Sequence, residues 1–176
     1  MKKLFVAAMA FLLCFAFNDL SAQDEAVTSQ LPKAEIQNLK GEKISTTTLG
    51  NNGQPFVISF WATWCKPCIS ELKAINEVYA DWQEETSIKF IAISIDDSKS
   101  SKRVAPFVKG KGFDFDVYLD ENSDFKRLMN VTNPPHLFLY NGKGEKVWEH
   151  TGYAPGDEEE LYNQIKKLTS TSAITK

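Results

Sequence analysis

Residues 56–68 read FVISFWATWCKPC, and this stretch decides the fold. Its first part, residues 56–61, is a nearly continuous run of β-branched and aromatic residues, which is typical of a strand buried on both faces of a sheet. From Pro67 to Trp82, apolar residues recur at helical spacing between charged ones, which predicts an amphipathic helix of about four turns. The proline is tolerated because it lies in the first turn. The CKPC segment therefore lies where a buried strand ends and a helix begins.

The rest of the chain alternates between short apolar runs and amphipathic stretches separated by turn residues. We expect a hairpin over residues 35–45, further strands over 88–95, 115–119, 137–140 and 146–150, and helices over 100–109, 123–129 and 157–168. Strands that alternate with helices run parallel through right-handed crossovers, whereas the Gly-rich turn at 141–144 joins antiparallel strands. The predicted fold class is α/β, a mixed central sheet with helices on both faces.

The first 22 residues have the pattern of a secretory signal peptide. A basic start is followed by an uncharged apolar run over residues 4–17 and by a small-residue exit at Ala22. The run is shorter than the roughly 18 apolar residues of a spanning helix. We expect cleavage after Ala22, secretion across the inner membrane and a periplasmic or otherwise extracytoplasmic location. A retained membrane anchor and lipidation of Cys14 are the alternatives.

Composition indicates one globular domain after this leader. The chain has 176 residues, of which 43% are hydrophobic and 24% charged, and this excludes a multi-pass membrane protein and a disordered tail protein. A polar lead-in is expected over 23–29, one domain over 30–168 and a polar tail over 169–176. The formal net charge is −3 and the charges are interspersed, so nothing indicates nucleic acid as a partner.

Cys65 and Cys68 are the two cysteines that remain without the leader. Two thiols spaced in this way at a helix start can bring their sulfurs within bonding distance. The unpaired N–H groups and the helix dipole stabilise a thiolate there, so we predict that Cys65 is the nucleophile and Cys68 the resolving thiol. A Cys65 thiolate attacks a substrate disulfide, and Cys68 then releases the reduced product. The reverse sequence oxidises a dithiol, and neither direction needs a cofactor.

Three other uses of the cysteine pair have to be weighed. A structural zinc site would need further ligands, but the mature chain has no second pair, and its two histidines, His136 and His150, lack ligand spacing. A structural disulfide across so short a loop would constrain the unfolded chain little. The alternative function is an extracytoplasmic copper chaperone that binds through Cys65 and Cys68, with His136 as a third ligand.

Residues 60–68, FWATWCKPC, resemble the active-site segment of the thioredoxin superfamily, specifically of its extracytoplasmic TlpA/ResA-like thiol-disulfide oxidoreductases. The resemblance covers about residues 31–168. It implies a thioredoxin fold with an N-terminal β-hairpin extension and an enzyme that acts on protein disulfides or dithiols, with reduction as the expected direction. It also implies a membrane electron donor as partner. We expect a monomer. A peroxidase of the same superfamily would have a lone reactive cysteine in a different setting.

The resemblance also implies a substrate-binding loop. Pro135 occupies the position of the family's cis-proline, which faces the disulfide and offers backbone to a docked peptide. His136 stands where the family usually has a small hydroxyl residue, and we hypothesise that it lies near Cys65 and stabilises the thiolate. Trp64 is expected to be partly exposed beside Cys65. The predicted substrate-binding residues are therefore Trp64, Pro135 and His136.

The proton acceptor differs from that of the thioredoxins proper. They bury an aspartate two residues before the tryptophan that ends the strand, and this chain has Ser59 there. Serine cannot act as a base at neutral pH. Glu71, three residues after Cys68, matches a glutamate of the ResA-like group, and it is the predicted proton relay.

Overall fold

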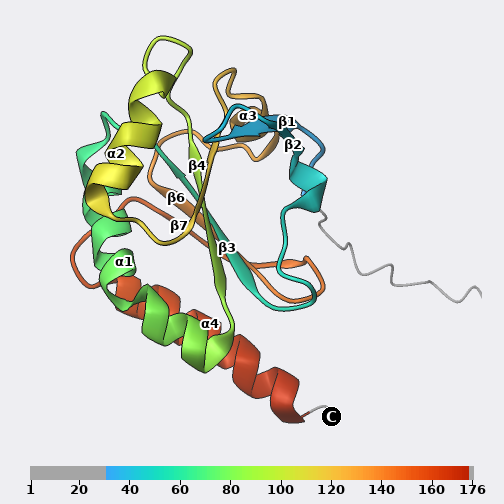
Figure 1. Cartoon of the computed structure of the whole chain (residues 1–176). Helices are drawn as coiled ribbons and strands as arrows, with labels where there is room; N and C mark the ends of the chain where they lie inside the picture. Colours follow the sequence, from blue (N-terminus) through green and yellow to red (C-terminus); the bar gives the residue numbers. More distant parts are fainter. Residues whose placement is uncertain (1–30, 175–176) are drawn as a thin grey trace, which may run out of the picture.

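The computed structural model describes residues 31–174, so the predicted signal peptide (1–22) and the expected lead-in (23–29) lie outside the described residues. Within 31–174 the chain forms one sheet of seven strands with helices packed on it (Figure 1). The strands are β1 (Glu35–Asn38), β2 (Lys43–Ser45), β3 (Phe56–Trp61), β4 (Lys89–Ser94), β5 (Asp116–Leu119), β6 (His136–Tyr140) and β7 (Lys146–Thr151). The helices are α1 (Lys66–Thr86), α2 (Val104–Lys111), α3 (Asp124–Leu128) and α4 (Asp157–Ile174), with the 3-10 turns η1 (Thr46–Thr48) and η2 (Ser101–Arg103).

The sheet is mixed, with the strand order β2-β1-β5-β4-β3-β6-β7. Strands β3, β4 and β5 are parallel. Strand β6 runs antiparallel to β3, and β7 antiparallel to β6. At the other edge, the β1–β2 hairpin joins β5 in antiparallel pairing. The predictions of a mixed sheet, an N-terminal edge hairpin and a closing hairpin are therefore confirmed.

Strand β3 lies inside the sheet, between β4 and β6, and all six of its residues are buried. Because both faces of the strand are covered, its sequence is apolar at every position except Ser59 and does not alternate. Four residues after its last residue, Trp61, the chain reaches Cys65 at the start of α1. The reactive segment is thus attached to one of the most buried strands of the domain.

Helices cover both faces of the sheet, as predicted. Successive residues of a strand point to opposite faces, and Trp61 packs against Phe107 of α2 whereas Phe60 packs against Phe125 of α3. The crossovers through α1 and α2 both advance from β3 towards β5, so right-handed connections place these two helices on one face. Helix α4 lies side by side with α1 (Figure 1). Within residues 31–174, no helix combines the length and apolarity that crossing a membrane requires.

Two helices are longer than predicted. Helix α1 has 21 residues and ends at Thr86, and the C-cap residue Ser87 takes a left-handed φ of 54°. Helix α4 continues to Ile174, so much of the expected polar tail (169–176) is helical and the predicted end at Leu168 is wrong. The physical reason is that no glycine or proline follows Leu168 to stop the helix, and Thr169 donates its hydroxyl to the carbonyl of Lys166 within it.

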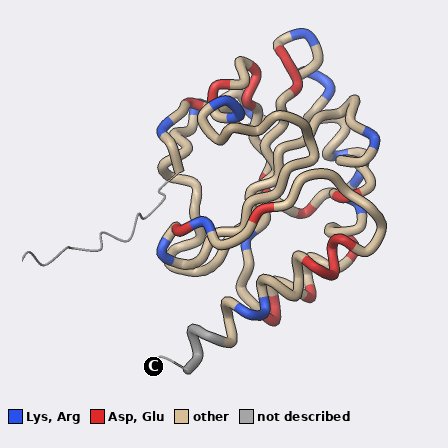
Figure 2. The backbone as a smooth tube through the Cα atoms, turned by 180° about the vertical axis from the view of Figure 1, so that it is seen from behind, with Lys and Arg blue, Asp and Glu red and all other residues tan. Residues whose placement is uncertain are grey.

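The first turn of α4 is acidic. Four consecutive acidic residues, Asp157–Glu160, occupy it, and they appear as the red stretch at that end of the helix in Figure 2. Negative charge is favourable at a helix amino terminus because it opposes the positive end of the dipole. The Asp157 carboxylate accepts the N–H of Ala154 at 2.7 Å and lies 3.3 Å from Nε2 of His150. This turn therefore fixes the connection between β7 and α4.

The turn between β6 and β7 leaves no room for a side chain at Gly142. A Cβ there would lie 2.0 Å from the carbonyl oxygen of Gly53. We expect Gly142→Ala to lower the free energy of unfolding by about 1–3 kcal/mol, because two backbone segments would have to separate. Urea unfolding measures this. Gly110→Ala in α2 is the control, since a Cβ at Gly110 meets nothing within 4 Å and should stabilise by about 0.5–1 kcal/mol. Equal stability of Gly142→Ala and the parent would contradict the close packing.

Candidate active site

Cys65 and Cys68 form a disulfide at the amino terminus of α1, with their Cα atoms 5.3 Å apart. Cys65 is the N-cap residue of the helix, and its Sγ accepts the backbone N–H of Cys68 at 3.3 Å. The exposed fraction is 6% for Cys65 and 0% for Cys68. A substrate sulfur can therefore approach Cys65, whereas Cys68 lies below the surface. These positions agree with what a nucleophile and a resolving thiol require, and the roles themselves stay predictions.

Glu71 lies beneath the disulfide in the buried part of α1. It follows Cys68 by three residues, which places both on one face of the helix with Cβ atoms about 5–6 Å apart. Its side chain is 1% exposed. One carboxylate oxygen accepts the hydroxyl of Ser59 at 3.1 Å, and the other has no hydrogen-bond partner among the described residues. The buried carboxyl thus keeps one oxygen available.

Burial changes the acidity of this carboxyl. Desolvation raises the pKa of Glu71 from 4.5 to about 8, while the hydrogen bond from Ser59 opposes the rise and the charge of Asp157 adds to it. Glu71 is therefore largely protonated at neutral pH when the disulfide is closed. Its pKa comes close to the value of about 8.5 of an ordinary thiol. A proton can pass between such groups at little cost in free energy.

The loop before β6 contains the cis peptide bond between Pro134 and Pro135. The carbonyl of Pro135 accepts the N–H of Gly152 at 2.9 Å, which ties this loop to the β7–α4 connection. The next residue, His136, pairs with Phe60 near the carboxyl end of β3. The loop therefore lies beside the carboxyl end of β3, from which the chain leads to Cys65. Contact of Pro135 with a substrate stays a prediction.

His136 does not have the surroundings that the hypothesis about the thiolate needs. Its ring stacks on Phe138 with the centroids 4.3 Å apart, and both ring nitrogens are buried without a hydrogen-bond partner in the part of the chain that the structure describes. Burial lowers the pKa of His136, which favours the neutral imidazole. A neutral ring cannot supply the positive charge that would stabilise a Cys65 thiolate. Contact of His136 with substrate stays a prediction.

The two tryptophans of the motif have different surroundings. Trp61 is fully buried and packs between Phe107 and Phe113. Trp64 is 62% exposed and is the residue next to Cys65. An exposed tryptophan offers a large contact area to a protein partner. This exposure supports Trp64 as the candidate contact for substrate.

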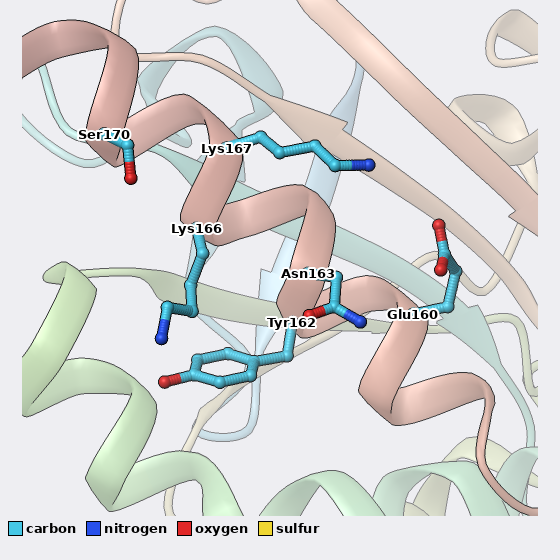
Figure 3. Close-up of a pocket in the computed structure, with 6 residues that line it drawn as sticks. All are labelled: Glu160, Tyr162, Asn163, Lys166, Lys167 and Ser170. Atoms are coloured by element: carbon cyan, nitrogen blue, oxygen red, sulfur yellow. The ribbon is translucent and has the colours of Figure 1, made fainter.

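Figure 3 shows a different hollow, which is lined by side chains of α4 alone. Tyr162 and Lys166 point towards α1, whereas Lys167 and Glu160 point the other way, so these side chains do not converge on a ligand. Tyr162 donates a hydrogen bond to Glu85, near the far end of α1. At a rise of about 1.5 Å per residue, that end lies about 30 Å from the cysteines. The hollow is therefore no part of the candidate active site.

The copper-chaperone alternative needs a third ligand near the cysteine pair. Among residues 31–174, no group of three or more His, Cys, Asp or Glu side chains is placed to hold a metal ion. His136 therefore does not complete a three-ligand set with Cys65 and Cys68, as that alternative assumed.

Comparison with known proteins is consistent with this geometry. A model of the AhpC/TSA family matches residues 27–149. The thiol-disulfide oxidoreductase ResA of Bacillus thuringiensis is 29% identical over 143 residues, which are 81% of this chain and 79% of the relative. A sporulation thiol-disulfide oxidoreductase of Bacillus subtilis is 28% identical over 162 residues, which are 91% and 94% of the two chains. The solution structure of a thioredoxin-like protein from Porphyromonas gingivalis is 48% identical and superposes with a TM-score of 0.73 over 80% of this chain and 92% of that one. The predicted thioredoxin-like fold is confirmed.

Proposed function

We infer the function from the premise that this chain belongs to the AhpC/TSA family: it is a thiol-disulfide oxidoreductase that exchanges disulfides with protein substrates through Cys65 and Cys68. The observation that carries this proposal is the disulfide at the start of α1, with a buried carboxyl one helical turn below it. The copper chaperone is not favoured, because the named relatives are thiol-disulfide oxidoreductases.

The reaction that we propose begins with the reduced protein. The Cys65 thiolate attacks one sulfur of a substrate disulfide, the substrate S–S bond breaks, and a mixed disulfide forms. The carboxylate form of Glu71 then takes the proton of the Cys68 thiol. The Cys68 thiolate attacks Sγ of Cys65, and the second substrate sulfur leaves as a thiolate. Two electrons pass to the substrate, and the protein ends with the Cys65–Cys68 disulfide closed.

The environment of Glu71 supports its part in the second step. A general base is most efficient when its pKa lies near the operating pH, because it is then partly ionised and still basic enough to take a proton. The pKa of about 8 of Glu71 is much closer to neutral pH than that of an ordinary carboxyl, and it lies near the value of about 8.5 of an ordinary thiol. The proposed substrate contacts are Trp64, Pro135 and His136. The exposure of Trp64 supports its role, and Pro135 is supported by its place in the loop beside the carboxyl end of β3.

The proposed setting is extracytoplasmic. The basic and apolar pattern of residues 1–17 supports export, and an oxidising compartment allows a disulfide to persist between cycles. A reductase there needs electrons from outside the compartment, so we propose a membrane-bound dithiol protein as the donor that reopens the Cys65–Cys68 disulfide. The proposed form is a monomer that acts in thiol redox homeostasis.

The direction of electron flow is tested by the equilibrium of the mature protein with glutathione and dithiothreitol. We expect a potential close to that of thioredoxin, roughly −270 mV, and reduction of a protein disulfide such as that of insulin in the presence of dithiothreitol. A potential near −120 mV would overturn the proposed direction, since such a protein donates disulfides. Failure to exchange with any dithiol or disulfide would overturn the function itself.

A further inference from the structure

A buried carboxylate at the end of β4 holds the loop that carries Cys65. The side chain of Asp96 is 0% exposed. One of its oxygens accepts the backbone N–H of Thr63 at 2.8 Å and the hydroxyl of Ser94 at 2.9 Å. The other accepts the hydroxyl of Thr63 at 2.6 Å. Thr63 is thus bound through both of its donors, two residues before Cys65.

The partners of this carboxylate indicate what it does. An ionised carboxylate is costly to bury unless hydrogen bonds satisfy it, and hydrogen bonds to a charged group are the stronger kind. None of the ion pairs found among the described residues includes Asp96. Two of the three donors to its side chain belong to Thr63. The neighbouring Asp97 is exposed, and within residues 31–174 its carboxylate accepts hydrogen bonds from Lys99 and Ser100 in its own turn.

The loop matters most when the disulfide is open. In the closed form, the S–S bond itself keeps Sγ of Cys65 close to the N–H of Cys68. After reduction that covalent link is gone, and the position of the sulfur depends on the backbone of the loop. The fixed points of this backbone are the hydrogen bond from Cys65 N–H to the Ala62 carbonyl at 3.0 Å and the two bonds from Thr63 to Asp96.

We propose that Thr63 and Asp96 are positioning residues, which keep Sγ of Cys65 at the amino end of α1 in the reduced protein. The helix N–H groups and dipole can stabilise the thiolate only while the sulfur stays there. The proposal rests on the proposed function, because it concerns the nucleophile of that reaction. It assigns to Thr63 an effect on thiol acidity that is separate from any effect on stability.

The sign of the effect separates positioning from simple charge repulsion. Asp96 is an acidic residue hydrogen-bonded to Thr63, two residues before Cys65, so a negative charge on it would by itself disfavour the Cys65 thiolate, and removing that charge would make the thiol more acidic. If the loop no longer holds Sγ of Cys65 at the helix terminus, the Cys65 thiol instead becomes less acidic. Thr63→Val keeps the charge, the backbone N–H and nearly the volume, and it removes only the hydroxyl donor. Thr63→Ser retains both donors and is the conservative control.

The experiment measures the pH dependence of Cys65 alkylation by iodoacetamide in the reduced mature protein. For Thr63→Val we expect a loss of thiol acidity of about three- to tenfold, which lies within the span of helix-terminus interactions with an anion at partly buried sites. The glutathione equilibrium should move towards the disulfide. Thr63→Ser and Asp97→Asn should stay within about twofold of the parent, below the loss expected for Thr63→Val. Glu71 is present in every variant, so its own titration does not distinguish them.

Two outcomes would overturn the proposal. One is a Thr63→Val protein that loses free energy of unfolding but keeps the alkylation profile and the glutathione equilibrium of the parent, since Thr63 would then be merely structural. The other is faster alkylation in Asp96→Asn at pH 7, which would assign the effect to charge alone. Alkylation needs no protein substrate, so either outcome is distinguishable from failure of the proposed function, in which the parent would not reduce protein disulfides.

Discussion

Replacing Cys65 by serine is expected to abolish disulfide reduction, with a loss of at least about 10³-fold. A serine hydroxyl is not ionised at neutral pH and cannot attack a disulfide, and Cys68 is too deeply buried to replace Cys65 as the nucleophile. The measurement is the rate of insulin reduction with dithiothreitol as the electron source.

Replacing Cys68 by serine should instead stop the reaction after its first step. The Cys65 thiolate still attacks the substrate, but no internal thiol resolves the mixed disulfide. Mass spectrometry should therefore detect a covalent complex with substrate in Cys68→Ser that disappears with excess dithiothreitol, and no such complex in Cys65→Ser. A complex that forms in Cys65→Ser and not in Cys68→Ser would contradict the proposed roles, because Cys68 would then be the nucleophile and Cys65 the resolving thiol.

The active-site segment and the strand before it could be predicted because each signal is local. Six consecutive buried residues in β3 leave a run that is apolar except for Ser59, and the change to helical spacing after Pro67 marks the start of α1. The end of α4 could not be predicted in the same way. Its last residues, 169–174, are neither apolar nor rich in helix breakers, and the helix continues simply because nothing stops it.

The hydrogen bonds around the site join residues that are distant in sequence. Thr63 and Asp96 are 33 positions apart, and Ser59 and Glu71 are 12 apart. Sequence reasoning treated Ser59 as a lost base and Glu71 as its substitute, whereas the structure joins the two in one hydrogen bond. Only the parallel pairing of β3 with β4 brings Asp96 next to the loop. A single sequence gives no signal for these long-range hydrogen bonds beyond the presence of acidic residues after β4.

His136 illustrates the opposite limit. Its type and its position after Pro135 suggested a cation near the nucleophile, because histidine is the side chain that gains charge most readily near neutral pH. The structure stacks the ring on Phe138 and buries both nitrogens, so burial lowers the pKa of the side chain instead. Electrostatic tuning of a site depends on how well each group is solvated, and residue type alone does not determine that.

Replacing Glu71 by glutamine is expected to slow resolution of the mixed disulfide by about 100-fold at pH 7, the lower end of the range for general acid–base catalysis. Glutamine keeps the shape of the side chain and can still accept the Ser59 hydroxyl, but it cannot take the proton of Cys68. The deficit should shrink above pH 9, where the thiol ionises without help. Rapid-mixing kinetics of the mixed disulfide measures the step, and Glu77→Gln, on the exposed side of the same helix, is the control.

The same variant tests the buried carboxyl through stability. Because the folded-state pKa of Glu71 is about 8, above its ordinary value of 4.5, the folded protein holds this proton more tightly than the unfolded chain. The resulting stability is fully present below pH 4.5 and is lost as the pH rises through about 8. From pH 5 to 9 the disulfide form of the parent should therefore lose roughly 2–4 kcal/mol relative to Glu71→Gln, which becomes the more stable protein at pH 9. Urea unfolding at both pH values measures this relative loss of stability. The exposed control Glu77→Gln should change in stability between pH 5 and 9 by the same amount as the parent. If the stabilities of the parent and Glu71→Gln differed by the same amount at both pH values, Glu71 would titrate as an ordinary carboxyl and could not match a thiol as its proton acceptor.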